Sequence, residues 1–391
     1  MTKETDQDRY LLGIMSGTSA DGINVAIIRE SNAKLIHFCE QPMPKELREP
    51  ILRLAEPGLD EIDPLGALDR ALGQTFSNAA LHAIKEAGIA SEKILAIGSH
   101  GQTIRHRPKG VKGGRPFTMQ IGCAATIAEQ TGITTVSDFR RRDIAAGGEG
   151  APLVPFAHHT LFGHSDHPIA ILNIGGIANV TYIDKNAGHE TITGFDTGPG
   201  NMIMDALMLN QSDGRHAYDR GGELAASGNI DDVLLNELLK HPYLKRIPPK
   251  STGREMFGSQ ITDRIMTWPD LSDADRMATA TEFTARSVAQ SCQFLPEVPE
   301  AWYICGGGTY NRHLISRLEQ LLAPASVKST SEIGILPEAM EAVCFALLAK
   351  QTLLGRPNTL PAVTGASHAV VGGQITPGNN WPDILELLHQ D

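Results

Sequence analysis

Short apolar runs separated by turns rich in Gly, Ser, Thr and Asp recur along the chain. Tyr10–Ile14 and Ile23–Ile28 flank the turn Met15–Gly22, and Ile169–Ile174 and Ala178–Ile183 flank Gly175-Gly176. Apolar β-type runs joined in this way predict hairpins. Both halves of the chain therefore open with strand, glycine turn and strand. This weak duplication favours two related halves that offer their glycine turns to a nucleotide, while two ordinary hairpins remain the alternative.

Helical periodicity follows each predicted hairpin. Leu65, Leu68, Leu72, Phe76 and Ala80 recur at helical spacing after Asp63-Pro64, which predicts a helix that begins there with Asp63 as N-cap and ends near Gly88. Further elements are expected in both halves: strands at Ile94–Ile97 and Tyr303–Cys305, and helices at Asn311–Leu322 and Pro337–Gly355. The mixture predicts the α/β fold class.

The segment Asp138–Pro155 changes in character, because a basic cluster, Arg140 to Arg142, precedes glycines and prolines. Such a change is typical of the approach to a domain boundary. We therefore predict an N-terminal domain at residues 1–145 and a C-terminal domain at residues 146–391.

Composition narrows the possible functions. The 391 residues are 41% apolar and 20% charged, which is a globular balance, and a net charge of −11 disfavours a general nucleic-acid or anionic-membrane binder. The polar start MTKETDQDRY predicts no signal peptide, and no apolar run reaches the length of a membrane span. Five scattered cysteines are typical of reduced thiols. We expect a cytoplasmic enzyme or binding protein.

The first turn carries candidate phosphate-binding groups. Gly17 and Gly22 permit close backbone approach, Ser16, Thr18 and Ser19 add hydroxyl donors, and Asp21 offers a carboxylate that suits Mg²⁺ through water. The alternative is a surface hairpin turn built from ordinary turn residues. The chain has neither GxxxxGK[ST] nor the HRD and DFG motifs of protein kinases, so any ATP use follows another architecture.

Asp196 is the candidate catalytic base. It follows a predicted strand and precedes Gly198 and Gly200, which presents a carboxylate where backbone can approach a phosphate. One alternative is an Asx-turn in which Asp196 bonds its own backbone. Aspartic-protease chemistry is disfavoured because it needs two such carboxylates and only one D[ST]G occurs.

Three weaker signals remain. Gly306-Gly307-Gly308 after a strand suits flat contact with an adenosine, or is a plain strand-to-helix connection. His158, His159, His164 and His167 match no common zinc spacing, and we expect them in a solvated loop. One arginine of the basic cluster is a candidate contact for an anionic ligand.

Nine blocks occur in the order found in anhydro-N-acetylmuramic acid kinases, and the chain resembles that family from about Leu12 to Gly372. The blocks are MSGTSADG, SHGQTIRH, DFRRRDIAAGG, GAPLVP, LNIGGIANV, FDTGPGNMIMDA, PKSTGRE, CGGGTYN and VTGAS. The family belongs to the superfamily of actin and the sugar kinases. The resemblance implies two domains of the ribonuclease-H-like fold that close around ATP.

The resemblance also implies a reaction. Water opens the 1,6-anhydro bridge of 1,6-anhydro-N-acetylmuramic acid while ATP phosphorylates O6, which gives N-acetylmuramic acid 6-phosphate during peptidoglycan recycling. Asp196 matches the base that activates the water, and Mg²⁺, with Asp21 as a metal-binding residue, neutralises the phosphates. Arg141 and Glu341 match sugar contacts, the arginine meeting the lactyl carboxylate, although Glu341 also suits a plain first-turn carboxylate.

Nucleotide contacts are implied in three segments. The first covers Gly17, Thr18, Ser19, Ala20, Asp21, Gly22, Ile23 and Asn24 as the ATP phosphate loop. Gly198 and Gly200 match a second phosphate turn, and Gly306, Gly307 and Gly308 match the adenosine loop.

Two departures from the family pattern are Asn24, where the family usually has Asp, and Cys123, where many members have Asp or Asn. They support one rival reading, a catalytically idle sugar or nucleotide sensor; a kinase of another amino sugar is a third. The resemblance further implies a homodimer.

Overall fold

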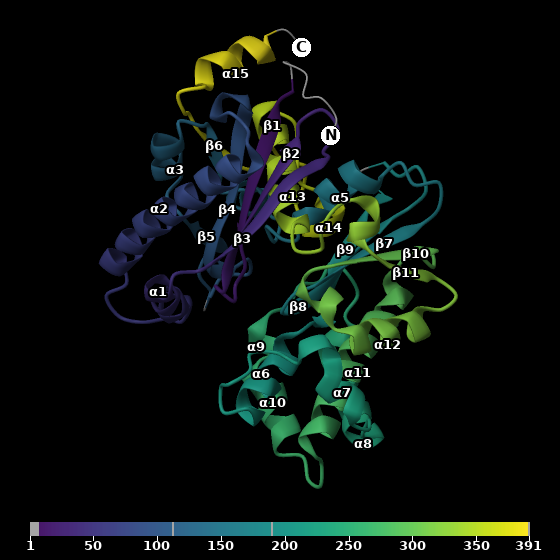
Figure 1. Ribbon diagram of the computed structural model, residues 1–391. Helices are drawn as coiled ribbons and strands as arrows, with labels where there is room; N and C mark the ends of the chain where they lie inside the picture. The colour runs from purple at the N-terminus through teal and green to yellow at the C-terminus, as the bar shows by residue number, and fades with distance from the viewer. Residues whose placement is uncertain (1–7, 112, 189–190, 390–391) are drawn as a thin grey trace. The chain divides into compact units, whose positions relative to one another are not determined.

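A computed structural model describes residues 8–111, 113–188 and 191–389, and the chain forms two units (Figure 1). Unit 1 comprises residues 1–161 and 339–391, and unit 2 comprises residues 162–338. Within the described part of the chain, no helix has the length and apolar character that a membrane crossing requires.

Unit 1 is built on a mixed sheet in which neighbouring strands run in the order β12-β6-β4-β1-β2-β3, with β5 also paired to β4. Its strands are β1 (Tyr10–Ser16), β2 (Gly22–Arg29), β3 (Leu35–Pro42), β4 (Ile94–Arg107), β5 (Phe117–Ile121), β6 (Thr135–Ser137) and β12 (Gln374–Thr376). Its helices are α1 (Lys45–Ala55), α2 (Ile62–Ala87), α3 (Ala124–Thr131), α4 (Arg141–Ala145), α13 (Met340–Leu353), α14 (Pro361–Thr364) and α15 (Trp381–Leu388). A short 3₁₀ turn, η1 (Ser91–Lys93), precedes β4, and α5 (Val154–Phe162) leads into unit 2.

Unit 2 repeats this plan with the strand order β11-β10-β7-β8-β9. Its strands are β7 (Ile169–Ile174), β8 (Ile177–Ile183), β9 (Thr193–Pro199), β10 (Ala301–Cys305) and β11 (Ser326–Ser329). Its α-helices are α6 (Met202–Gln211), α7 (Glu223–Ser227), α8 (Asp232–Leu238), α9 (Arg254–Phe257), α10 (Ser259–Met266), α11 (Asp273–Ser291) and α12 (Arg312–Leu322). The 3₁₀ turns are η3 (Arg220–Gly222), η4 (Pro242–Lys245), η5 (Cys292–Phe294), η6 (Gly307–Tyr310) and η7 (Thr330–Ile333).

The two sheets have the same topology. In unit 1, β1 pairs antiparallel with β2, β2 antiparallel with β3, and β4 parallel with both β1 and β6. In unit 2, β7, β8, β9, β10 and β11 repeat these relations one for one. This is the ribonuclease-H-like strand order, so the expected α/β class and the duplicated hairpins are confirmed.

The observed division differs from the predicted boundary at residue 145 in two respects: unit 1 continues to residue 161, and residues 339–391 return to it. The reason for that return is the packing of α13 on the first sheet. Gly13 and Gly98 are register partners on β1 and β4, and α13 lies against both. A Cβ on Gly13 would lie 1.8 Å from the Ala342 carbonyl oxygen, and one on Gly98 would lie 2.2 Å from that of Phe345. Two glycines in register thus let helix backbone approach strand backbone.

Alternating side chains of β1 face the opposite layer. Leu12 and Ile14 belong to a buried core with Leu72 and Phe76 of α2. The helix ends as expected, since Gly88 follows it in the left-handed region at φ 66°, but it begins at Ile62 rather than at Asp63, which lies in its first turn. Strand pairing also extends β4 well beyond the predicted Ile94–Ile97.

The histidine-rich segment is not the expected solvated loop throughout. His158 and His159 lie on α5, and His158 is buried. Burial lowers the pKa of His158 to about 3, so the side chain is neutral at physiological pH.

Candidate functional site

The candidate phosphate loop is the turn between β1 and β2 of unit 1. Ser16 is buried at the end of β1, and its hydroxyl donates to Gln102 Oε1 at 2.7 Å. Gln102 Nε2 in turn donates to the Gly17 carbonyl oxygen at 3.1 Å. Ala20 has a positive φ of 52°, and its N–H donates to the same Gly17 oxygen. β4 therefore holds the turn in one shape while Thr18 stays exposed.

Asp21 is the exposed carboxylate of this turn. Its Oδ1 accepts from Arg48 Nη2 at 2.8 Å, and its side chain is 62% exposed. One bound oxygen and an open position suit a carboxylate that reaches Mg²⁺ through water beside a nucleotide. Asn24 lies on β2 as the partner of Met15 and of Glu40, and it brings an amide oxygen where a second carboxylate would add charge.

The buried side chain of His100 positions Arg140, the first arginine of the basic cluster. His100 Nε2 faces Arg140, with Nη2 at 2.9 Å, and Arg140 Nη1 donates to the Gly150 carbonyl oxygen at 2.8 Å. Burial and the Arg140 charge lower the pKa of His100 to about 3, so the ring is neutral and its Nε2 accepts. Burial raises the pKa of Glu341 in the first turn of α13, and the charge of Arg140 opposes that rise. Arg140 is thus electrostatically coupled to the predicted sugar contact Glu341.

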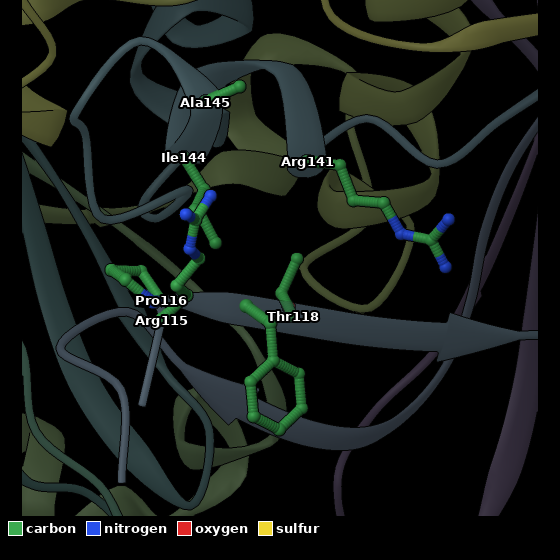
Figure 2. Close-up of a pocket in the computed structure, with 7 residues that line it drawn as sticks. Arg115, Pro116, Thr118, Arg141, Ile144 and Ala145 are labelled. Atoms are coloured by element: carbon green, nitrogen blue, oxygen red, sulfur yellow. The ribbon is translucent and has the colours of Figure 1, made fainter. Parts of the chain in front are cut away.

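Arg141, the other predicted sugar contact, lines a cavity of about 410 Å³ in unit 1 (Figure 2). Its lining comes from α4 and from β5 with the residues just before it: Arg115, Pro116, Phe117, Thr118, Arg141, Ile144 and Ala145. Arg141 Nη1 also lies 3.3 Å from Asp138 Oδ2. Two arginines beside apolar side chains suit a small anionic molecule with apolar substituents.

Asp196 of β9 lies at a β-bulge in unit 2. It pairs with Asn179, whereas the next pair joins Gly198 to Ala178, so Thr197 is the extra residue. Bulges re-aim neighbouring side chains and are common beside catalytic groups. The Asp196 carboxylate is half-buried, and its Oδ2 accepts from the Thr252 N–H at 2.8 Å.

The backbone of Asp196 is also held. Its N–H donates to the Lys250 carbonyl oxygen at 3.2 Å, and its carbonyl oxygen accepts from the Tyr243 hydroxyl at 2.8 Å. The segment 250–252 is therefore hydrogen-bonded to both the main chain and the carboxylate of Asp196.

Lys250 is an unusual support for a carboxylate. Its side chain is 3% exposed, and within the described residues its Nζ has no hydrogen-bond partner. The Nζ lies 4.4 Å from the ring centre of Phe294, 5.0 Å from that of Tyr243 and 5.3 Å from that of Phe195. Burial, and then the Arg246 charge, lower the pKa of Lys250 to about 8, while Asp196 acts in the opposite direction.

Three glycine segments meet in unit 2. The N–H of Gly200 donates to the Gly176 carbonyl oxygen, and a Cβ on Gly200 would lie 2.2 Å from the Gly175 carbonyl oxygen. A Cβ on Gly308 would lie 2.3 Å from Ile174 Cγ2. The turn after β7, the end of β9 and the start of η6 thus pack closely on one another, and we call this cluster the glycine cradle. Backbone without Cβ atoms at these positions suits contact with a phosphate or a flat base.

The predicted site residues fall into two groups. Unit 1 carries Gly17–Asn24, Arg141 and Glu341, and unit 2 carries Asp196, Gly198, Gly200 and Gly306–Gly308. In unit 2 the structure brings Gly200, Gly306 and Gly308 together around Gly175 and Ile174, whereas Gly198 packs against Ser287 and Leu244.

The residues that hydrogen-bond to Asp196 were not predicted from the sequence. Lys250 and Thr252 stand in the block PKSTGRE, which was recognised without any role, and Tyr243 carried no signal. The one local hint was a lysine that directly follows two prolines, Pro248 and Pro249.

Two sheets of ribonuclease-H topology, each with a glycine turn at the first hairpin, define the class: the superfamily of actin-like ATPases and sugar kinases. The sequence model of anhydro-N-acetylmuramic acid kinase matches residues 9–378. The chain belongs to that family of kinases, which confirms the resemblance seen in the motifs.

Curated relatives carry the same family name as the matching sequence model. The chain is 44% identical to the anhydro-N-acetylmuramic acid kinase of Coxiella burnetii (strain RSA 493 / Nine Mile phase I) over 378 residues, which are 96% of this chain and 99% of the relative. It is 44% identical over 375 residues to that of Shewanella pealeana, covering 95% of this chain and 100% of the relative.

Solved structures are more distant. Component A of the (R)-2-hydroxyglutaryl-CoA dehydratase of Acidaminococcus fermentans has a TM-score of 0.45 at 12% identity and covers 87% of this chain and 96% of its own. A ROK family glucokinase from Streptomyces griseus has a TM-score of 0.39 at 11% identity and covers 88% and 99%. At these scores the likeness supports no conclusion about this chain.

Proposed function

We propose that this protein opens the anhydro bridge of 1,6-anhydro-N-acetylmuramic acid with water and transfers the γ-phosphoryl group of ATP to O6, giving N-acetylmuramic acid 6-phosphate and ADP. Membership of the kinase family supports the substrates. The observation that carries the chemistry is Asp196, whose half-buried carboxylate at a bulge accepts from the Thr252 N–H, while two further hydrogen bonds hold its backbone.

One water molecule, the anhydro sugar and ATP give the phosphorylated sugar, ADP and one proton. Asp196 takes a proton from water, and the water oxygen forms a bond to the anomeric carbon as the bond from that carbon to O6 breaks. O6 then bonds to the γ-phosphorus, and the bond from that phosphorus to the β-γ bridging oxygen breaks to release ADP. The proton on Asp196 returns to solvent, so each turnover releases one proton. General-base catalysis of this kind contributes about 10²–10⁴-fold.

The other residues bind and orient. We assign the Gly17–Asn24 turn and the glycine cradle of unit 2 to ATP, and the cavity with Arg141 to the sugar. Arg141 pairs with the lactyl carboxylate, and Glu341 accepts from a sugar hydroxyl. Asp21 is the residue suited to hold Mg²⁺, which when bound neutralises phosphate charge.

A coupled ADP-release assay with ATP, Mg²⁺ and the anhydro sugar tests the proposal. Asp196→Asn should abolish ADP release and ring opening together, because one base serves both bond changes. In ¹⁸O-water, heavy oxygen should appear at the anomeric hydroxyl before mutarotation exchanges it. Absence of that label, or ADP release by Asp196→Asn at the wild-type rate, would refute the mechanism.

The same assay separates the rivals. A sensor binds sugar or nucleotide without releasing ADP, and a kinase of another amino sugar releases ADP only with that sugar. The homodimer remains a prediction, which mass measurement in solution tests.

A further inference from the structure

A mixed cluster of donor side chains lies on unit 1 outside the residues assigned above. His37 and Cys39 are two positions apart on β3, so they point to the same face of the strand. Glu86 lies in the last turn of α2. One nitrogen, the sulfur and one carboxylate oxygen of these three residues lie within 4.8 Å of one another.

A fourth donor adjoins this cluster. His82 precedes Glu86 by one helical turn, and its Nε2 lies 3.3 Å from Glu86 Oε2. His37 Nε2 lies 3.3 Å from the same oxygen. Two imidazoles therefore face one carboxylate oxygen, with the thiol beside them.

Cys39 and Glu86 add two different donor types to the cluster, a half-buried thiol and a carboxylate. A divalent metal that coordinates a thiol deprotonates it, and the resulting thiolate is a strong ligand. The four side chains together offer two nitrogens, one sulfur and one oxygen.

We propose that His37, Cys39 and Glu86, with His82 as fourth ligand, bind one thiophilic divalent metal ion of the zinc type that pins β3 to the end of α2. Imidazole, thiolate and carboxylate are zinc ligands, whereas Mg²⁺ and Ca²⁺ prefer oxygen donors alone. On binding, the sulfur–metal bond forms and the thiol proton passes to solvent.

The geometry is close to what zinc needs. With zinc–ligand distances of about 2.0–2.3 Å, neighbouring donors of a tetrahedral site lie about 3.5 Å apart. Because the donor atoms of His37, Cys39 and Glu86 all lie within 4.8 Å of one another, no pair exceeds this spacing by more than about 1.3 Å, which side-chain rotation covers. His37 and Cys39 lie on β3, which has a register shift between Leu35 and His37, and Glu86 lies in the last turn of α2, so all three ligands come from hydrogen-bonded secondary structure.

Cobalt(II) titration of the full, metal-stripped and reduced chain without nucleotide tests the site. We expect one equivalent of Co²⁺ to give a thiolate charge-transfer band and the intense visible bands of tetrahedral coordination. Cys39→Ser should abolish the charge-transfer band, and His37→Gln should weaken binding at least about tenfold. The matched control Cys292→Ser removes a half-buried thiol of unit 2 and should leave the spectrum unchanged.

A second measurement needs no variant. Zn²⁺ should protect Cys39 from alkylation in the folded chain, as mapped by mass spectrometry, and should raise the thermal midpoint of wild type but not of Cys39→Ser. A charge-transfer band that survives in Cys39→Ser, or no band with all thiols reduced and Co²⁺ in excess, would overturn the proposal. Binding at Asp21 offers only oxygen and produces no such band, so the result is independent of the proposed kinase reaction.

Discussion

Replacing Lys250 by methionine should make unit 2 more stable and the enzyme slower. Lys250 is 3% exposed among three aromatic rings, and burial together with the Arg246 charge lowers its pKa from 10.5 to about 8. The native state therefore holds the ammonium less readily than the unfolded chain does. A buried charge kept at such a cost beside the proposed catalytic carboxylate of Asp196 is expected to serve function rather than stability.

The gain in unfolding free energy expected for Lys250→Met follows from the lowered pKa of Lys250. A fall from 10.5 to about 8 corresponds to about 3 kcal/mol, because each tenfold change in proton affinity is worth about 1.4 kcal/mol. Contact with the ring faces offsets about 1–2 kcal/mol of this. Methionine fills a similar volume and packs well on aromatic rings. The net gain at pH 7 is about 1–2 kcal/mol, or roughly 2–8 °C in Tm for a unit of this size.

The pH dependence has a definite sign. Below pH 8 both native and unfolded chains carry the charged lysine, and the native state bears the full penalty. Between pH 8 and 10.5 the native chain loses the proton first, so wild-type stability rises with pH relative to the variant. The gap in Tm should be largest below pH 8 and should close between pH 8 and 10.5. At pH 10.5 the wild type should be the more stable protein, because it gains about 3 kcal/mol over that range.

Activity should change in the opposite direction. Lys250 anchors the segment that grips Asp196, so loss of the anchor should lower kcat about 10- to 100-fold with little change in the KM for ATP. The charged groups that face Lys250 are Arg246 and Asp196. Wild-type kcat/KM should fall above pH 8 as Lys250 deprotonates, and Lys250→Met should lack that limb.

ADP release across pH 6 to about 10 and thermal melts of the same samples measure both effects. Lys245→Met is the matched control, because it makes the same replacement at an exposed lysine on η4, five residues before Lys250. A variant with wild-type kcat and an unchanged alkaline limb would refute the positioning role. A lowered Tm below pH 8 would refute the assignment of the buried charge as destabilising.

Three further predictions concern other parts of the molecule. Arg141→Ala should raise the sugar KM roughly 10- to 100-fold at nearly constant kcat, because a charged contact is lost; an unchanged KM in the ADP assay would remove Arg141 from the sugar site. Gly13→Ala should destabilise unit 1 by about 3 kcal/mol in urea melts, since the new Cβ would lie 1.8 Å from a backbone oxygen of α13, whereas Gly66→Ala on α2 meets no atom within 4 Å and should be neutral or stabilising. Glu282→Gln should cost about 3 kcal/mol, because that carboxylate is 1% exposed and accepts from two arginines, while the exposed Glu237→Gln should change stability by less than about 1 kcal/mol.

Glu282 also makes a pH prediction. Burial raises its pKa, but the hydrogen bonds from Arg317 and Arg286 outweigh burial and hold it below the ordinary 4.5. Its stabilising contribution is therefore complete above pH 4.5 and is lost as the pH falls toward the lower native value. Melts of wild type and Glu282→Gln should converge in acid, and parallel curves would contradict this.

The local pattern of apolar residues predicted the buried strands next to glycine turns. The strands Ile169–Ile174 and Ile177–Ile183 appear within one residue of expectation, because buried strands next to glycine turns leave a continuous apolar signal. β4 was predicted too short because its second half, from Ser99 to Arg107, is polar. In that half, Ser99 pairs with Ile14 of β1, and the residues from Gln102 to Arg107 pair with β5. Strand pairing, and not an apolar pattern, therefore makes it a strand.

Sequence alone determined the chemical inventory of this protein: two glycine turns, one carboxylate between glycines, a basic cluster and the order of motifs that marks the family. The tertiary structure decided which groups act on which. Asp196 is gripped by residues about fifty positions away, and a C-terminal helix returns to the first sheet because Gly13 and Gly98 leave it room. The physical reason is that hydrogen-bond partners, desolvation and close backbone approach depend on distances in space. Residue types and spacing fix what a side chain offers, and only packing fixes what it meets.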